Sequence, residues 1–195
     1  ALHRTAGEHA YDFRLLEAVL TVNDRQKTAL VPRIVEALGD ADGRLDGRRV
    51  AVWGLAFKPN TDDVREAPAH YVIRALAARG ADVVAFDPEA IETTRALLGE
   101  GDLDEGSIAY AAGLYDAAVG ADALVICTEW PEFRRPDLER VRRALKTPAS
   151  GFPLVFDGRN VFEPERMAEA GFDYHAIGRP HVAPQAVEDE QRAEA

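Results

Sequence analysis

The sequence is poor in the residues that characterise disulfide-rich, membrane-spanning or nucleic-acid-binding proteins. It has one cysteine among 195 residues, which excludes an internal disulfide and a cysteine-rich metal site. No apolar run approaches the length of a membrane span, and the start lacks the basic and apolar segments of a secretory signal. Only three of the 23 basic residues are lysines, and the net charge is −11. This charge disfavours binding to nucleic acid or anionic membranes. Because the sequence shows neither a span nor a signal, we expect a cytoplasmic globular protein.

The first forty residues have the apolar spacing of a helix, with Gly39 as a candidate C-cap. Pro32 lies inside this pattern and should kink or split the helix, because proline lacks an N–H and crowds the preceding turn. A helix of this length does not bury its apolar side alone, so we expect it to pack on another domain or on a second subunit. The division that follows is a helical segment at 1–39, a domain at 46–184 and a disordered acidic tail at 185–195.

Beyond the helical segment, short apolar runs alternate with helical patterns. Strands are predicted at 49–54, 82–87, 123–128, 154–157 and 174–177, and helices at 68–79, 91–98, 137–145 and 164–170. This alternation predicts an α/β fold, with a doubly wound, mainly parallel Rossmann-like sheet preceded by a long helix. Ligands of such sheets bind at the carboxyl ends of the strands, so the candidate site lies in the loops that follow the first four strands.

The loop at 54–68, GLAFKPNTDDVREAP, holds the most informative polar residues. It follows a strand and precedes a helix, where many α/β proteins bind phosphate, but it contains neither the G-x-G-x-x-G fingerprint nor a Walker motif. Lys58 offers a point cation for a phosphate or hydroxyl, and Arg65 offers a planar fork for a phosphate or carboxylate. The residues alone leave open a solvated loop in which Asp62 and Asp63 pair with Arg65.

Several other residues have structural interpretations. Cys127 lies in an apolar run and is expected to be a buried side chain. Asp87 stands where dinucleotide folds keep a ribose-binding acid, but turn capping is favoured. Trp130 and Phe133 could stack on a base or cover the sheet, and packing is favoured, whereas the role of Glu129 stays open. The five histidines show no metal-ligand spacing, so no metal site is expected.

Five segments of the chain, in order, resemble the UDP-glucose/GDP-mannose dehydrogenase family, and the similarity covers roughly residues 1–180. Residues 54–66 resemble a signature of that family, and Pro59 favours its UDP-glucose branch. Residues 15–26 resemble the family's central helix. The remaining three segments, at 85–88, 128–133 and 156–160, resemble the ends of its second, third and fourth C-terminal strands with their loops.

The resemblance implies an enzyme that oxidises the C6 alcohol of a nucleotide sugar to a carboxylate. Two hydrides pass to NAD, which is held mainly by an N-terminal domain. A cysteine thiolate captures the intermediate aldehyde, and a thioester is then hydrolysed. Phe57, Lys58 and Arg159 would contact the UDP-sugar, and Arg65 would reach NAD across the cleft. The helical segment at 1–39 would be the end of the dimerisation helix, so a homodimer is expected.

Two motifs of the family do not occur in this sequence: the Cys-x-Pro-Lys-Asp motif with the catalytic cysteine, and the G-x-G-x-x-G domain. Cys127 lies in the wrong place to replace that cysteine. We therefore expect no catalytic residue in this chain, which would be the substrate-binding part of a UDP-glucose 6-dehydrogenase, inactive alone, as an excised piece or a stand-alone relic. The alternatives are a non-catalytic nucleotide-sugar-binding module, a dimerisation piece with a vestigial pocket, or a dehydrogenase for UDP-N-acetylhexosamine or GDP-mannose.

Overall fold

A computed structural model describes residues 5–6, 8–9, 11–99 and 107–185. Its centre is a six-stranded sheet in the order β3-β2-β1-β4-β5-β6, and all neighbouring strands are parallel. The strands are β1 (Arg49–Trp53), β2 (Asp82–Phe86), β3 (Ile108–Tyr110), β4 (Ala123–Ile126), β5 (Leu154–Asp157) and β6 (Asp173–Ala176). The predicted α/β class with a doubly wound sheet is confirmed.

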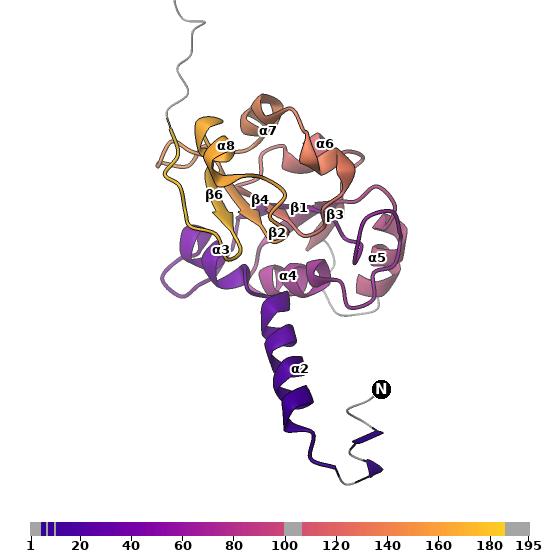
Figure 1. The fold of residues 1–195 in the computed structure, drawn as a ribbon. Coiled ribbons are helices and arrows are strands. Elements are labelled where there is room, and N and C mark those ends of the chain that lie inside the picture. The colour runs from indigo at the N-terminus through magenta and orange to yellow at the C-terminus, as the bar shows by residue number, and fades with distance from the viewer. Residues whose placement is uncertain (1–4, 7, 10, 100–106, 186–195) are drawn as a thin grey trace, which may run out of the picture.

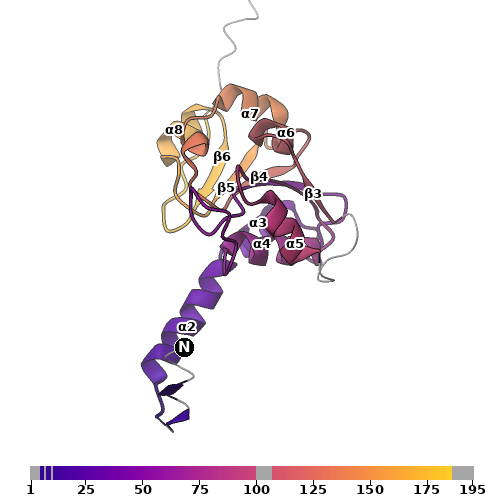
Figure 2. The same cartoon turned by 90° about the vertical axis from the view of Figure 1, so that its right-hand side faces the viewer.

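Helices cover both faces of this sheet (Figures 1 and 2). Helices α3, α4 and α5 lie on one face, and α6, α7 and α8 lie on the other. Their bounds are α3 (Val31–Leu38), α4 (Pro68–Ala77), α5 (Ile91–Leu98), α6 (Leu114–Ala118), α7 (Leu138–Ala144) and α8 (Pro164–Glu169), with a 3₁₀ helix, η1, at Pro131–Arg134. A sheet covered on both faces needs strands that are apolar on both sides, and every residue of β4 and β5 is buried.

Beyond residue 40, the strands and helices predicted from the apolar patterns are all present, and their ends differ from the predictions by at most two residues. The helical segment predicted at 1–39 is not helical at 11–13 and is helical at Arg14–Lys27 and Val31–Leu38. The elements that the sequence analysis did not predict are β3, α6 and η1. Strand β3 has only three residues, which is too short for a strand pattern to be recognised in the sequence. Helix α6 has five residues, which is too short for a helical period to be visible. The tail predicted to be disordered lies outside the described residues from position 186 onward.

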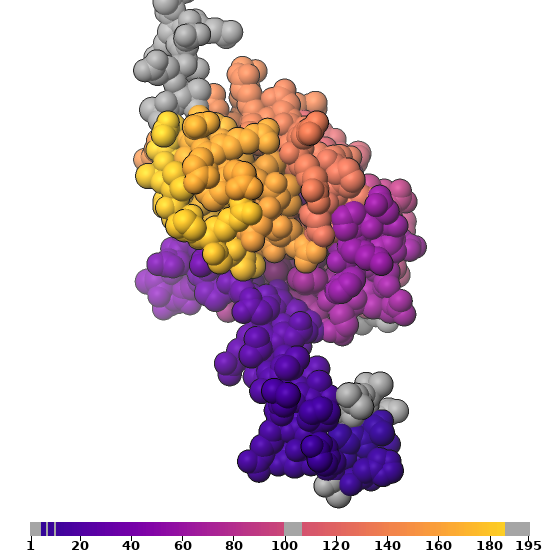
Figure 3. All heavy atoms as spheres, viewed as in Figure 1, coloured from indigo at the N-terminus to yellow at the C-terminus, as the bar shows by residue number. Residues whose placement is uncertain are grey.

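The N-terminal helix is divided, as Pro32 predicted. Helix α2 (Arg14–Lys27) ends three residues before α3, and Pro32 lies in the first turn of α3, where its missing N–H has no helical partner to lose. Helix α3 buries an apolar side against the domain, whereas α2 has no buried residue. Figures 1 and 3 show α2 projecting from the globular part as a separate column. No helix within the described ranges combines the length and apolarity that crossing a bilayer requires.

The strand order reverses between β1 and β4, which pair with each other: β2 and β3 are added on one side of β1, and β4, β5 and β6 on the other. At this point the backbone leaves β1 through Gly54, whose φ of +90° favours glycine. A Cβ atom on Gly54 would lie 2.5 Å from the Cβ of Thr128, in the loop after β4. Thr128 also donates its hydroxyl to the carbonyl of Ala56 at 2.6 Å. The two loops therefore depend on glycine at position 54 to pass this closely.

Gly54→Ala is expected to destabilise the chain more than Gly47→Ala. Both glycines have positive φ, but a Cβ at Gly47 would meet nothing within 4 Å. Gly47→Ala should therefore cost only the conformational penalty of about 1 kcal/mol, and Gly54→Ala should add about 1–3 kcal/mol from overpacking against Thr128. Urea unfolding of both variants measures the difference. Equal losses of unfolding free energy would contradict the close approach of the two loops.

Candidate functional site

The loop after β1 is held at its start by the buried carboxylate of Asp87. The Oδ2 atom of Asp87 accepts the backbone N–H groups of Leu55 and Ala56 at 2.7 and 3.1 Å, and the indole N–H of Trp130 at 3.0 Å. Its Oδ1 atom accepts two further N–H groups from its own turn. Asp87 thus caps turns, as the sequence favoured, and has no oxygen directed to a ribose.

The aromatic residues of the loop after β4 are packing residues. Trp130 is 5% exposed and Phe133 is fully buried. The ring of Phe133 stacks on that of Trp53 with centroids 5.2 Å apart. These observations decide between the two interpretations in favour of packing, because neither ring has a free face for a base.

The loop after β5 is organised by a second buried carboxylate, Asp157. Its Oδ1 atom accepts the backbone N–H of Arg159 at 2.8 Å. Its Oδ2 atom accepts the backbone N–H of Val161 at 2.7 Å and the hydroxyl of Tyr174 at 2.7 Å. Burial, followed by the charge of Asp157, raises the pKa of Tyr174 above its ordinary value, so this hydroxyl stays a donor. The backbone at Arg159 is therefore fixed by the buried carboxylate of Asp157, which sets where its side chain begins.

Arg159 forms a two-point ion pair with Glu129 of the loop after β4. The Nε atom of Arg159 lies 2.5 Å from Oε2 of Glu129, and Nη2 lies 2.9 Å from Oε1. The pair holds the pKa of Glu129 below its ordinary value and raises that of Arg159. The sequence left the role of Glu129 open, and in the structure Glu129 orients Arg159 across neighbouring strand ends.

A cleft of about 570 Å³ opens at these strand ends, beside α2. This volume lies within the range of about 300–1,000 Å³ that is usual for small-molecule sites. Of the four residues predicted from the resemblance, Phe57 and Arg159 line the cleft. Its lining residues are Asn23, Gln26, Lys27, Leu30, Phe57, Glu66, Pro68, Val72, Cys127, Gly158, Arg159 and Ile177.

The other two predicted residues lie outside this lining. Lys58 is exposed and follows Phe57 on the same loop. The side chain of Arg65 is 87% exposed, and its guanidinium bonds both carboxylate oxygens of Asp63 at 2.9 and 2.7 Å. Arg65 holds the pKa of Asp63 down to about 2. This is the local ion pair between Asp63 and Arg65 that the sequence left open as an alternative to ligand binding. In this conformation the guanidinium of Arg65 is bonded to Asp63 and lies outside the cleft lining, so its predicted role at NAD requires a ligand or domain that the described residues do not include.

One wall of the cleft was not predicted, because it comes from α2. Lys27 anchors this wall: its Nζ atom bonds Glu66 at 2.5 Å, Asp24 at 3.0 Å and the hydroxyl of Tyr71 at 3.3 Å. The bond to Glu66 is the largest cause of a raised pKa for Lys27, and it lowers the pKa of Glu66. The sequence does show that Asn23, Gln26 and Lys27 share one side of the helix, because they follow i, i+3, i+4 spacing. This spacing does not indicate which element that side faces.

A second cavity of about 390 Å³ lies on the other side of Arg159. It shares Gly158, Arg159 and Ile177 with the first and adds the cation of Arg134. Arg159 thus lies between an apolar cavity and a polar one, at the point where the strand order reverses. A parallel sheet with such a cleft defines a ligand-binding domain of the doubly wound class.

Comparisons with known proteins assign the family. Residues 51–164 match the model of the UDP-glucose/GDP-mannose dehydrogenase family, UDP binding domain. The chain belongs to this family. It is 45% identical over 183 residues to UDP-glucose 6-dehydrogenase of Pseudomonas aeruginosa and 43% identical over 180 residues to that of Rhizobium meliloti, covering 93% and 92% of this chain. It spans 38% of the length of each relative.

Solved structures agree with this assignment. A UDP-glucose dehydrogenase from Pyrobaculum islandicum has a TM-score of 0.65 and 33% identity, over 90% of this chain and 34% of that one. A UDP-D-ManNAc dehydrogenase from Pyrococcus horikoshii has a TM-score of 0.69 and 26% identity, over 91% of this chain and 36% of that one.

Cys127 is expected to react slowly with thiol reagents although it borders the cleft. It is 5% exposed, and burial raises the pKa of its thiol to about 12, so the reactive thiolate is scarce at pH 8. Iodoacetamide labelling followed by mass spectrometry tests this, with Val119→Cys as an exposed control because Val119 is 57% exposed. The introduced thiol should be modified first, and Cys127 only in denaturant. Labelling of both at the same rate would contradict the buried, protonated state.

Proposed function

We propose that this chain is the substrate-holding part of an NAD-dependent UDP-glucose 6-dehydrogenase that acts in the cytoplasm and supplies UDP-glucuronate for polysaccharide synthesis. The observation that carries the proposal is the position of Arg159 in the cleft at the β1/β4 reversal, within a chain of this family. The oxidation itself requires groups that this chain does not contribute.

The cleft suits the three parts of a nucleotide sugar. The planar guanidinium of Arg159 matches a diphosphate, which would compete with Glu129 for its donors. The apolar wall, with Leu30, Phe57 and Val72, offers a surface for a base and a ribose. Lys58, exposed after Phe57, can reach a sugar hydroxyl at the mouth. The resemblance implied that Phe57, Lys58 and Arg159 contact the UDP-sugar, with Lys58 near the sugar, and the assignment of the diphosphate to Arg159 extends it.

The residues of this chain do not fit NAD at the end of β1. The loop at 54–68 has no glycine-rich turn, and Asp87 uses both carboxylate oxygens for N–H groups of the protein. NAD accepts the hydrides in this reaction, and we assign its binding mainly to the rest of the enzyme. Arg65 is exposed enough to reach across to that part, provided it exchanges Asp63 for the cofactor.

The thioester nucleophile is likewise assigned outside this chain. Cys127 is buried, and its thiol is neutral at physiological pH, so it does not serve as a nucleophile. This chain's part in the reaction is to bind the nucleotide, to orient the sugar and to exclude water from one side of it.

Three alternatives share the same cleft. The relative from Pyrococcus horikoshii is a UDP-D-ManNAc dehydrogenase, so a UDP-N-acetylhexosamine is a second candidate substrate, and GDP-mannose is a third. A binding module without activity would use the same contacts. Binding specificity distinguishes the substrates, and turnover of the intact enzyme distinguishes an enzyme from a module.

Arg159→Ala is expected to weaken UDP-glucose binding about tenfold to a hundredfold, since bonds to a charged group contribute about 1.5–3 kcal/mol. Lys58→Ala should weaken it less, because Lys58 is exposed to water. Calorimetric titration of the chain measures both, with GDP-mannose and a UDP-N-acetylhexosamine titrated in parallel. Arg166→Ala, an exposed arginine on α8, is the matched control. Wild-type affinity in Arg159→Ala would contradict the assignment of the diphosphate.

We further propose that the chain forms a homodimer through α2. Leu15, Val19 and Val22 follow i, i+4, i+7 spacing on this helix, and their exposed fractions are 73%, 54% and 55%. An apolar stripe of this kind is stable in water only when another surface covers it. A second copy of α2 is the occupant that the family resemblance implies.

The double variant Leu15→Glu/Val19→Glu is expected to convert the dimer into a monomer, because four carboxylates would face one another in the helix pair. Light scattering after size-exclusion chromatography gives the mass. Leu97→Glu is the control, since Leu97 is a 41%-exposed apolar residue on α5. A wild-type chain that stays monomeric at high concentration would refute the dimer.

A further inference from the structure

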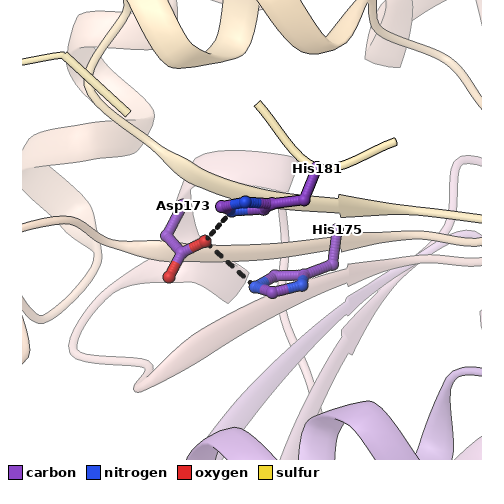
Figure 4. Close-up of side chains that lie close together, drawn as sticks. All are labelled: Asp173, His175 and His181. Carbon is purple, nitrogen blue, oxygen red and sulfur yellow. Dashed lines mark hydrogen bonds and ion pairs between the residues drawn. The ribbon is translucent and has the colours of Figure 1, made fainter. Parts of the chain in front are cut away.

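Three potential metal ligands meet on β6, the edge strand farthest from β3 (Figure 4). Asp173 and His175 belong to this strand and, two residues apart, point to the same side of it. His181 belongs to the segment that follows the strand. One ligand atom from each of the three residues lies within 4.8 Å of the other two.

The distances are close to those of a metal site. The Nε2 atoms of His175 and His181 lie 3.0 and 2.9 Å from the same atom, Oδ1 of Asp173. Four-coordinate zinc with bonds of about 2.0–2.1 Å places neighbouring ligand atoms about 3.3 Å apart. A shift of a few tenths of an ångström would therefore open the cluster enough for an ion between the two rings and the carboxylate.

One ring nitrogen in this cluster has no hydrogen bond of its own. The Nε2 atom of His175 is buried, and its close partner is Oδ1 of Asp173 at 3.0 Å. This contact lowers the pKa of Asp173, but the carboxylate does not meet the ring with good hydrogen-bond alignment. A buried polar atom without a partner is uncommon and costs free energy. A histidine–aspartate–histidine cluster built only for hydrogen bonding would align both rings with the carboxylate. A cation at the centre supplies the missing partner.

Aromatic contacts hold the ligands in place before an ion binds. The ring of His175 stacks on Phe156 of β5, with centroids 5.0 Å apart and planes at 17°. His181 stacks on the outer face of His175, with centroids 5.2 Å apart. The side chain of His181 is 47% exposed, so an ion can enter from solvent. The segment that carries His181 is tied down again where the N–H of Gln185 bonds the carbonyl of Ala168 at 2.9 Å.

A cavity of about 360 Å³ borders the two strand ligands and provides room for a further ligand. A water molecule in this cavity can fill the fourth position, since Glu36 lines the cavity but does not belong to the cluster. Arg33 lines the same cavity and donates to the carbonyl of Ala176 at 2.9 Å. The positive charge of Arg33 opposes cation binding, so we expect a weaker affinity than that of a closed structural zinc site.

The geometry points to a binding site for one divalent transition-metal ion, best fitted by Zn²⁺, formed by Asp173, His175 and His181 and separate from the nucleotide-sugar cleft. Two imidazoles and one carboxylate are ligands that zinc accepts, whereas calcium and magnesium prefer oxygen ligands. A bound ion would fasten the segment after β6 against an edge strand that is otherwise open to pairing. Histidine spacing predicted no metal site, because the third ligand is brought back by the fold.

Titration of the tag-free chain with ZnCl₂, by calorimetry, and with CoCl₂, by visible absorption, tests the site. One ion per chain is expected, with the d–d absorption of four- or five-coordinate cobalt. His181→Ala and Asp173→Asn should each weaken binding by about tenfold or more. His9→Ala, an exposed histidine elsewhere in the chain, should leave it unchanged.

Thermal unfolding separates loss of the ion from loss of the fold. Zn²⁺ at a concentration that saturates the wild type should raise the melting temperature of the wild type and of His9→Ala, and should raise that of His181→Ala by clearly less. Because His181 is half exposed, its removal should leave the metal-free melting temperature close to that of the wild type. Absence of saturable binding, or equal affinity in the wild type and His181→Ala, would overturn the site.

Discussion

The cleft depends on two buried carboxylates at the carboxyl edge of the sheet. A buried charge is tolerated only when its oxygens are bonded, and Asp87 and Asp157 meet this condition with N–H and O–H donors from the loops around them. Asp87 joins the loops after β1 and β4 to its own turn, and Asp157 orders the loop after β5. The two buried carboxylates thus fix the positions of the loops. The side chains on the outer side of the loops can contact a ligand.

The proposed function depends on the side chains that point outward from the loops held by Asp87 and Asp157. Arg159, directed by Asp157 and paired with Glu129, stands between two cavities at the reversal of strand order. The same loops have no glycine-rich turn and leave no free acid for a ribose, which separates a substrate-binding half from the dinucleotide-binding half of such enzymes. The fold therefore repeats the architecture of a dinucleotide domain, and under the proposed function its loops bind a nucleotide sugar in place of a dinucleotide.

The sequence predicted most of the fold, because strands covered on both faces and helices capped by proline and glycine produce visible patterns. It did not predict β3 and α6, which are too short to show a period. Of the site, the loops that bear Phe57 and Arg159 could be found from motifs that follow strands. The wall made by Lys27 and the cluster of Asp173, His175 and His181 could not, because both depend on tertiary contacts that the local pattern does not show: α2 meets the loop after β1, and the segment after β6 turns back on its strand. The placement of Lys58 and Arg65 in a site stays a prediction.

We propose that the nucleotide binds in the cleft whose loops are held by Asp87 and Asp157. Chemical-shift mapping of the ¹⁵N-labelled chain with UDP tests it most directly, because each backbone amide reports its own surroundings. We expect shifts concentrated at the end of α2, in the loops after β1, β4 and β5 and at Ile177 after β6, with Asp173 and His181 unaffected. Shifts that spare the loop at 158–162, or that cluster on the opposite edge of the sheet, would contradict it.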